Sequence, residues 1–246
     1  MPENNPFLSI VIPALNEEER LPITLEQVFD FLGRQDFTAE VLLVENGSTD
    51  RTLEIAQDFA RSHPSLHPLH EAQRGKGRAV RRGMLEARGE YRFICDADLS
   101  MPIGVLCRFL PPQMQDVDIA IGSREAAGSV RYDEPYRRHL SGRVFNWLIH
   151  LLVLPGLQDT QCGFKCFTAA AAQDIFPRLT LTGWSFDVEA LFIARRHGYH
   201  IVEIGIPWYF NSHSKVSLVR DSLRMGTDLL AIRRNARLGL YDGKLA

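Results

Sequence analysis

Two carboxylates, Asp96 and Asp98, follow a short apolar run and are separated by a single small residue. The run from Tyr91 to Cys95 is typical of a buried strand, so both acids are expected at the rim of the core, where open α/β folds bind ligands. Acids this close repel each other unless cations neutralise them. Mg²⁺ or Mn²⁺ held between one or two carboxylates and substrate phosphates would do so. A strand that ends in an acidic turn or helix cap is the alternative.

Polar residues also follow two earlier apolar runs. Asn16 and Glu17 come after the run at 8–12, and Glu45 and Asn46 come after the run at 40–44. Because parallel strands share one carboxyl edge, the three polar clusters are expected to converge on one crevice. Amide and carboxylate oxygens accept from the N–H and O–H groups of a base and a ribose. The pattern predicts a nucleotide site, although loop and cap chemistry explains any one cluster alone.

Gly75, Lys76 and Gly77 open a predicted helix over 76–87. A helix N-terminus with close backbone access can hold phosphate. The spacing matches neither the P-loop nor the full dinucleotide-binding fingerprint. A solvated basic turn is therefore the alternative.

The elements that must position these residues alternate in the first half of the chain. Apolar runs predict strands, and residues at helical spacing predict helices between them. The strands are expected at 8–12, 40–44, 91–95 and 118–121, and the helices at 17–32, about 49–60 and 76–87. This order predicts a mostly parallel sheet covered on both faces.

The pattern changes after about residue 125. An Arg-rich stretch leads to an apolar helix ending near Pro155, followed by a helix at 185–197, a strand at 200–204 and a basic amphipathic helix at 217–237. No linker or repeat divides the chain. We therefore expect one domain over 1–246, with a nucleotide-binding half at about 7–125 and an acceptor half at about 126–246.

Composition narrows the class of protein. The chain has 246 residues, 45% of them hydrophobic and 24% charged, with a formal net charge of -2. A general nucleic-acid binder would usually be basic. The N-terminus lacks a signal-peptide pattern, and the longest apolar stretch is too short to span a bilayer, so a cytoplasmic protein is expected. The four cysteines show no zinc or disulfide pattern.

The order of the motifs resembles the inverting GT-A glycosyltransferases of family 2. In the first half the resemblance rests on Ser9–Glu17, Val44–Asp50, Arg74–Gly77 and Asp96–Asp98. In the second half, Asp159–Lys165, Trp184–Glu189, Ser214–Lys215 and Met225–Leu230 are similar to the dolichyl-phosphate glucosyltransferases and, more distantly, the mannose synthases. The resemblance covers about residues 7–239. It implies a Rossmann-like α/β GT-A fold with an amphipathic helical C-terminal part.

The resemblance also implies roles for individual residues. The nucleotide would be lined by Pro13, Ala14, Asn16, Glu17, Glu45, Asn46, Gly75, Lys76 and Asp96. Asp96, Asp98 and Ser100 would hold Mg²⁺ or Mn²⁺ against the diphosphate. Arg124 and Lys215 are candidates to contact donor or acceptor phosphates. Asp187 lies where many members carry a general base, and Asp159 is a second candidate; both acids have structural alternatives, which for Asp187 is capping of the 185–197 helix.

The reaction implied is transfer of a hexose from a nucleotide sugar, UDP-glucose first, to a polyprenyl or dolichyl phosphate. A soluble hydroxyl acceptor, which would need a base, and GDP-mannose as donor are alternatives. Many members carry two carboxylates where this chain has Glu45 and Asn46, so the choice between uracil and guanine stays open. A sugar-1-phosphate nucleotidyltransferase is the alternative from another class.

Eukaryotic members of the group that this chain resembles carry a membrane anchor, and none is expected from this sequence. Peripheral contact with the inner face of the membrane through the helices at 144–154 and 217–237 is one interpretation, because a basic amphipathic helix can lie on an anionic surface. Packing of the second helix onto the core is the alternative.

Overall fold

A seven-stranded sheet forms the centre of the computed structural model, which describes residues 5–210 and 218–243. Its strands are β1 (Leu8–Ala14), β2 (Ala39–Glu45), β3 (Leu66–His70), β4 (Tyr91–Ile94), β5 (Ile119–Ser123), β7 (Lys165–Thr168) and β8 (Ile201–Gly205). They lie in the order β3-β2-β1-β4-β7-β5-β8, and every pairing is parallel except the two made by β7. The predicted mostly parallel sheet is confirmed.

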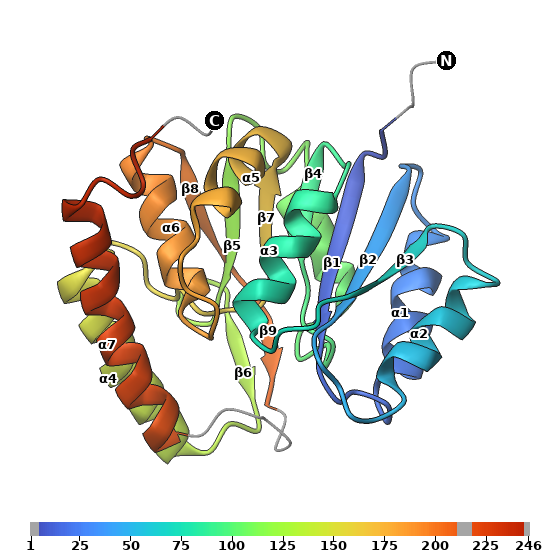
Figure 1. The fold of residues 1–246 in the computed structure, drawn as a ribbon, viewed down its shortest axis with the longest axis horizontal. Coiled ribbons are helices and arrows are strands. Elements are labelled where there is room, and N and C mark those ends of the chain that lie inside the picture. Colours follow the sequence, from blue (N-terminus) through green and yellow to red (C-terminus); the bar gives the residue numbers. More distant parts are fainter. Residues whose placement is uncertain (1–4, 211–217, 244–246) are drawn as a thin grey trace.

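Helices cover both faces of this sheet (Figure 1). They are α1 (Leu21–Leu32), α2 (Thr52–Ala60), α3 (Lys76–Glu86), α4 (Tyr136–Leu152), α5 (Ala169–Ile175), α6 (Phe186–Arg196) and α7 (Leu218–Arg237), with short 3₁₀ helices η1 (Ile103–Phe109) and η2 (Phe176–Arg178). One hydrophobic core joins α3, α5 and α6 to one face, and a second joins α1, α2 and η1 to the other. In the described ranges no helix is both long and apolar enough to cross a membrane.

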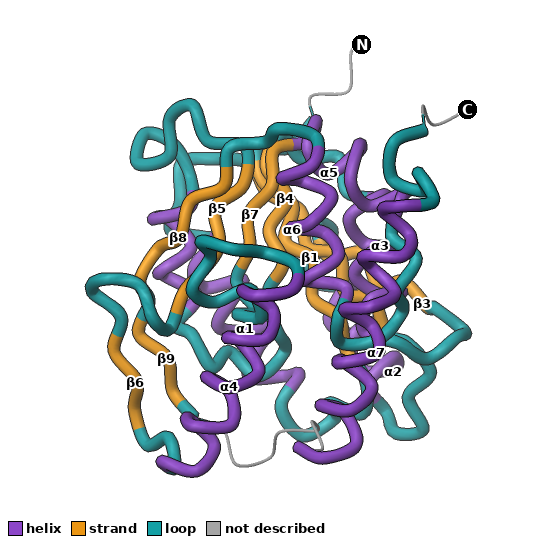
Figure 2. Tube along the Cα trace, turned by 90° about the vertical axis from the view of Figure 1, so that its left-hand side faces the viewer, coloured by secondary structure: helices purple, strands orange, loops and turns teal. Residues whose placement is uncertain are grey.

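Several short elements were not predicted, namely β3, β7, α5 and the pair β6 (Val130–Tyr132) and β9 (Pro207–Tyr209). The strands β6 and β9 pair with each other and form a small sheet beyond one end of the main one (Figure 2). Strands of three to five residues are too short to show a clear hydrophobic period. The antiparallel β7 also begins with a buried lysine, which interrupts the apolar pattern.

The helix predicted over 17–32 begins at Leu21 instead. The preceding residues form a turn, in which the N–H of Leu21 donates to the carbonyl of Glu17 at 2.8 Å. The N–H of Glu17 donates to the Thr52 hydroxyl at 2.7 Å. The loop after β1 is therefore fastened to the segment that follows β2.

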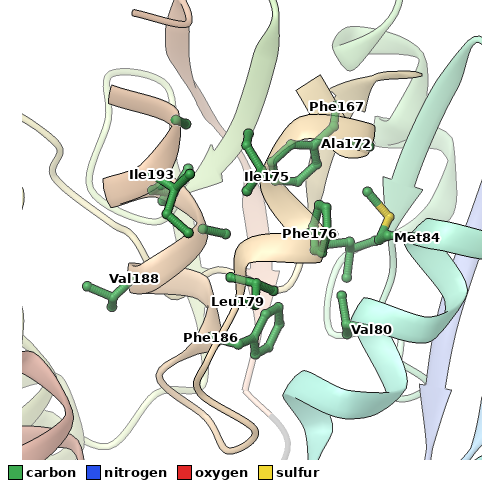
Figure 3. Close-up of a cluster of buried hydrophobic side chains, with 14 of the residues drawn as sticks. Val80, Met84, Phe167, Ala172, Ile175, Phe176, Leu179, Phe186, Val188 and Ile193 are labelled. Carbon is green, nitrogen blue, oxygen red and sulfur yellow. The ribbon is translucent and has the colours of Figure 1, made fainter. Parts of the chain in front are cut away.

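A tight core between α3 and α6 holds residues 179–186 in place (Figure 3). Val80 and Met84 of α3 belong to the same buried cluster as Phe176 and Leu179, and Phe186 at the start of α6 is 1% exposed. Burial of large apolar side chains is the main favourable term in folding. This core therefore fixes the segment from 180 to 185, named here the 180–185 loop, against the first turns of α3.

Candidate active site

The loops after β1 and β2 meet, as the sequence predicted. The backbone N–H of Asn16 donates to the Ser48 hydroxyl at 3.0 Å, and the Asn16 side-chain oxygen accepts from the N–H of Thr49 at 2.8 Å. Asn16 adopts a left-handed backbone conformation with φ 53°. Asparagine is among the residues that tolerate this region best. Asn16 thus orders both loops at the carboxyl edge of the sheet.

Glu45 and Asn46 are buried at the end of β2. The Glu45 carboxylate accepts from the N–H of Ser48 and lies 2.6 Å from His70 Nδ1. Burial alone would raise the pKa of Glu45, but the hydrogen bonds from Ser48 and His70 outweigh it and lower that pKa. The sequence analysis missed His70, which ends β3 directly opposite Glu45 in the strand register.

Lys76, at the start of α3, is paired with the first of the two acids after β4. Its Nζ lies 2.6 Å from Asp96 Oδ1 and 5.2 Å from the centroid of the Trp184 ring. Burial would lower the pKa of Lys76, but the carboxylates of Asp96, Asp187 and Asp98 more than offset burial and raise that pKa. Lys76 is therefore a fixed cation, and the solvated-turn alternative is wrong for this residue.

The glycines on either side of Lys76 allow α3 to approach the 180–185 loop. A Cβ on Gly75, whose φ is 147°, would lie 2.4 Å from the carbonyl oxygen of Thr182. The N–H of Gly77 donates to the same carbonyl at 3.0 Å. Close backbone contact of this kind excludes side chains. The glycine pattern thus brings α3 against the segment that carries Trp184.

Asp98 lies in a strained turn. Leu99 has φ 44°, a conformation that is uncommon for a bulky residue and often found at functional sites. The N–H of Ser100 donates to Asp98 Oδ1 at 3.0 Å, and the Ser100 carbonyl accepts from the N–H of Tyr209 at 2.8 Å. The turn therefore orients the Asp98 carboxylate and ties it to β9.

Two buried charges from the second half of the chain complete the cluster. Lys165 Nζ of β7 lies 2.7 Å from Asp187 Oδ1 of α6. Burial raises the pKa of Asp187, opposed by the positive charges of Lys165 and Lys76. The hydroxyl of Ser185, the residue before α6, donates to Asp228 at 2.6 Å. Asp187 is therefore part of a charge cluster rather than a helix cap, and its partner Lys165 was missed.

Arg124 and Asp159 neutralise each other. The guanidinium donates to both carboxylate oxygens at 2.6 and 2.8 Å, and the backbone N–H of Arg124 adds a third bond at 3.0 Å. Burial would raise the pKa of Asp159, but the charge and hydrogen bonds of Arg124 lower it to about 2. A carboxylate held this way is a poor base, so the geometry favours Asp187 over Asp159. Lys215 lies outside the described residues.

The donor set at Asp96 and Asp98 fits a metal that arrives with a substrate. Within 5–210 and 218–243, no group of three or more His, Cys, Asp or Glu side chains is arranged to hold a metal by itself. Magnesium sites in proteins often use one or two carboxylates, with substrate phosphates supplying further oxygens. Asp98, oriented by the turn, and Asp96, held by Lys76, meet that requirement.

Comparison with known proteins adds a family to this geometry. Residues 9–176 match the model of glycosyl transferase family 2. The chain is 36% identical to the dolichyl-phosphate beta-glucosyltransferase of Drosophila melanogaster over 240 residues, covering 92% of this chain and 74% of that protein. It is 35% identical to the human enzyme of the same name over 249 residues, covering 95% and 77% of the two chains.

Solved structures share the fold. Glucosyl-3-phosphoglycerate synthase from Mycobacterium tuberculosis in complex with uridine diphosphate superposes with a TM-score of 0.65, at 20% identity, over 92% of this chain and 80% of that one. The same enzyme in complex with Mn²⁺, UDP-glucose and glycerol 3-phosphate gives a TM-score of 0.60, at 20% identity, over 95% and 80%. These likenesses confirm the expected GT-A-type fold.

Proposed function

This chain belongs to glycosyl transferase family 2, and from that premise we propose that it transfers glucose from UDP-glucose to a polyprenyl phosphate with inversion. Family membership makes it a glycosyltransferase and decides against the sugar-1-phosphate nucleotidyltransferase. The names of the relatives support glucose and a dolichyl phosphate. The complex of the mycobacterial enzyme with Mn²⁺ and UDP-glucose supports the donor and the metal.

The observation that carries the proposal is the charge cluster at the carboxyl edge of the sheet. It brings Lys76, Asp96, Asp98, Lys165 and Asp187 together from β4, β7, α3 and α6. Two cations among three carboxylates leave one acid in excess. An excess carboxylate beside a fixed ammonium suits a cation and a diphosphate that bind together.

Charge development explains what these side chains would do. Cleavage of the sugar–phosphate bond leaves a nucleoside diphosphate with additional negative charge. A divalent ion bound at Asp98 and Asp96 would stabilise this charge electrostatically. Lys76, held between Asp96 and Trp184, is a cation that needs no rearrangement at the moment of reaction. The anomeric carbon gains oxocarbenium character, and attack from the opposite face inverts its configuration.

The acceptor decides whether a base is needed. A phosphate acceptor is already ionised and requires cations to hold it, a role that we assign to Lys215, because Arg124, the other candidate, is neutralised by Asp159. A hydroxyl acceptor would need a general base, and Asp187 is then the better-placed acid because burial raises its pKa. We propose the phosphate acceptor, with Asp187 holding Lys165.

Glu45 and Asn46, at the end of β2, are the residues that we expect to select the nucleobase of the sugar donor. The other residues that we assign to the nucleotide are Pro13, Ala14, Asn16, Glu17, Gly75, Lys76 and Asp96. Glu45 is oriented by Ser48 and His70. Its carboxylate can accept from the N–H edge of uracil or of guanine. UDP is favoured through the solved complexes, and GDP-mannose is the competing donor.

A surface on α4 and α7 supports peripheral membrane contact. Leu151, Leu230 and Leu238 are each more than 60% exposed, and they share a groove with Arg233, Arg234 and Arg237. A neighbouring face of α7 packs into the core through Leu229, Ile232 and Ala236, so the packing alternative holds for that face. Apolar side chains beside arginines match the acyl and phosphate layers of an anionic leaflet.

The test of the reaction is release of UDP from UDP-glucose by the purified protein with Mn²⁺. We expect release only when a polyprenyl phosphate is added, loss of release with excess EDTA, and a product with the opposite anomeric configuration by NMR. A free polyprenol and GDP-mannose serve as competing acceptor and donor. Transfer to the polyprenol, faster use of GDP-mannose, or full activity in EDTA would each overturn the corresponding part of the proposal.

Flotation with vesicles tests the membrane contact separately. We expect binding to vesicles containing phosphatidylglycerol and much weaker binding to pure phosphatidylcholine. Replacing Arg233, Arg234 and Arg237 with glutamine should abolish the difference. Arg34 and Arg61, exposed at or just beyond the ends of α1 and α2, are the matched control positions. The control protein carries glutamine at Arg34 and Arg61. If it binds the anionic vesicles no better than the protein with glutamine at Arg233, Arg234 and Arg237, the surface on α4 and α7 is ruled out.

A further inference from the structure

Glu189 of α6 is a completely buried carboxylate that accepts hydrogen bonds from four donors. The N–H groups of Thr180 and Leu181 donate at 3.0 and 2.8 Å, and the Thr180 hydroxyl donates as well. The Tyr241 hydroxyl donates at 2.7 Å from beyond the end of α7. A carboxylate with several donors to its charged form is a strong anchor. Glu189 therefore fastens the start of the 180–185 loop to α6 and to the C-terminal segment.

Helix α7 holds the same loop at two further points. Asn235 donates to the Thr180 hydroxyl at 3.0 Å, and Ser185 donates to Asp228 at 2.6 Å. Both ends of the loop are therefore bonded to α7. The chain reaches Asp187 only two residues after Ser185, so the same bonds fix the start of α6.

The middle of the loop touches the reaction cluster. The Thr182 carbonyl accepts from the N–H of Gly77, and the Trp184 ring lies beneath the Lys76 ammonium. The apolar contacts of Leu179 and Phe186 with α3 set the distance between the two segments (Figure 3). Movement of the loop would therefore move Lys76 relative to Asp96.

We infer that Glu189 is a positioning residue for the transfer reaction. It acts through the 180–185 loop on the Lys76–Asp96 pair and touches neither substrate. The inference deepens the proposed function and rests on it for its kinetic part. Replacing the Glu189 carboxylate with an amide should preserve the fold but loosen the 180–185 loop. The amide NH₂ group is itself a donor, so it cannot accept hydrogen bonds from the backbone N–H groups that Glu189 now binds.

The chain offers a matched control in Glu40. This carboxylate is 3% exposed and also accepts from four donors, namely the Ser9 hydroxyl and the N–H, Nε and Nη2 groups of Arg88. Glu40 lies at the amino end of β2, whereas the reaction cluster lies at the carboxyl end. The two residues therefore match in burial and hydrogen bonding and differ in location.

The experiment compares Glu189→Gln with Glu40→Gln. For both full-length variants, the rate of amide hydrogen exchange is measured over residues 75–78. The kcat and KM for UDP-glucose are then determined by varying the UDP-glucose concentration. For Glu189→Gln we expect exchange of the Gly77 amide to rise about tenfold and kcat/KM to fall by about 10- to 100-fold, the size typical of a small misplacement of reacting groups. For Glu40→Gln we expect neither change, although both proteins should lose stability.

A second variant keeps the test open if Glu189→Gln does not fold. Tyr241→Phe removes one donor and should raise exchange at Gly77 and lower kcat/KM about threefold, with a melting temperature close to that of Glu40→Gln. Unchanged exchange at Gly77 in both variants, or an equal kinetic loss in Glu40→Gln, would overturn the inference. If the parent chain transfers no sugar, the proposed function fails while the exchange measurement still tests the positioning role.

Discussion

The two ends of the central sheet each bury a polar cluster, and we propose that only the one at the carboxyl end binds a ligand. At the amino end, Glu40 is satisfied by Ser9 and Arg88, and the N–H of Gly89 donates to the Ser9 hydroxyl at 2.7 Å. At the carboxyl end, Lys76 and Lys165 face the acids Asp96, Asp98 and Asp187. Burial of charge is common to both ends, so burial alone does not mark a site.

The ends differ in charge balance and in backbone strain. The amino-end cluster lowers the pKa of Glu40 because hydrogen bonds from Ser9 and Arg88 outweigh burial. At the carboxyl end the reaction cluster carries one acid in excess, and the bulky Leu99 is left-handed with φ 44°, whereas the left-handed residue before β5 at the amino end is Asp116, a type that tolerates this conformation. Strain and unbalanced charge persist where function requires them. The following predictions test this distinction.

The largest effect is expected for Asp98→Asn. Loss of the carboxylate should lower kcat by about 100-fold or more, the size seen when one electrostatic stabiliser of the transition state is removed. Addition of Mn²⁺ above the wild-type requirement should restore little activity. Steady-state kinetics with Glu40→Gln as the comparison decide the matter. Near-normal turnover of Asp98→Asn would mean that the excess acid has no role.

The next effect is the loss of folding stability at acidic pH that comes from the pair of Arg124 and Asp159. Arg124 follows β5 at the carboxyl end, yet its pair with Asp159 is closed in the manner of the Glu40 cluster. Because the pKa of Asp159 falls from 3.8 to about 2 on folding, its stabilisation is complete above pH 4 and lost as pH falls towards 2. It amounts to about 2 kcal/mol. Denaturant unfolding of Asp159→Asn should show a correspondingly shallower loss between pH 4 and 2.

If the acid-induced loss of stability is the same with and without Asp159, this pair is not the closed ion pair described above. Parallel measurements on Asp98→Asn provide the reference, because its carboxylate is proposed to serve the substrate rather than the fold.

Two glycine substitutions, one at each end of the sheet, should affect different measurements: activity at the carboxyl end and stability at the amino end. A Cβ at Gly163 would lie 2.0 Å from Asp96 Oδ2, whereas a Cβ at Gly89 would lie 2.5 Å from the backbone nitrogen of Ser9. Gly163→Ala should displace Asp96 and lower kcat/KM about tenfold. Gly89→Ala should cost about 1–3 kcal/mol of stability through overpacking and leave the turnover of the folded protein unchanged. Thermal unfolding and kinetics are measured on both variants. A loss of turnover in Gly89→Ala, or unchanged kinetics in Gly163→Ala, would contradict the distinction between the two ends.

The smallest effect is expected for Asp187→Asn. With a phosphate acceptor no base is required, so turnover should fall less than about tenfold, whereas loss of a general base would cost about 100-fold or more. The measurement is kcat with a polyprenyl phosphate and with a free polyprenol. A 100-fold loss with the phosphate would assign Asp187 to proton transfer after all.

Much of the fold could be predicted because its signals are local. Continuous apolar runs ended by Pro13, Glu45 and Asp96 marked β1, β2 and β4, and the glycines at 75 and 77 marked the start of α3. The strands β3 and β7 escaped because each is short and polar residues interrupt it. An antiparallel strand inserted between β4 and β5 leaves no local mark, since pairing direction is decided by partners distant in sequence.

The sequence by itself determined which side chains reach the carboxyl edge, because parallel strands end together and their next residues must lie there. Only the tertiary structure decided what each of them touches. Lys76 meets Asp96 and Trp184, Lys165 meets Asp187, and Arg124 is taken by Asp159. These pairings join residues about 20 to 110 positions apart in the chain. Their geometry depends on how the helices pack onto the sheet. The order of residues in the chain therefore determines which charged side chains reach this edge, and packing determines which of them form pairs.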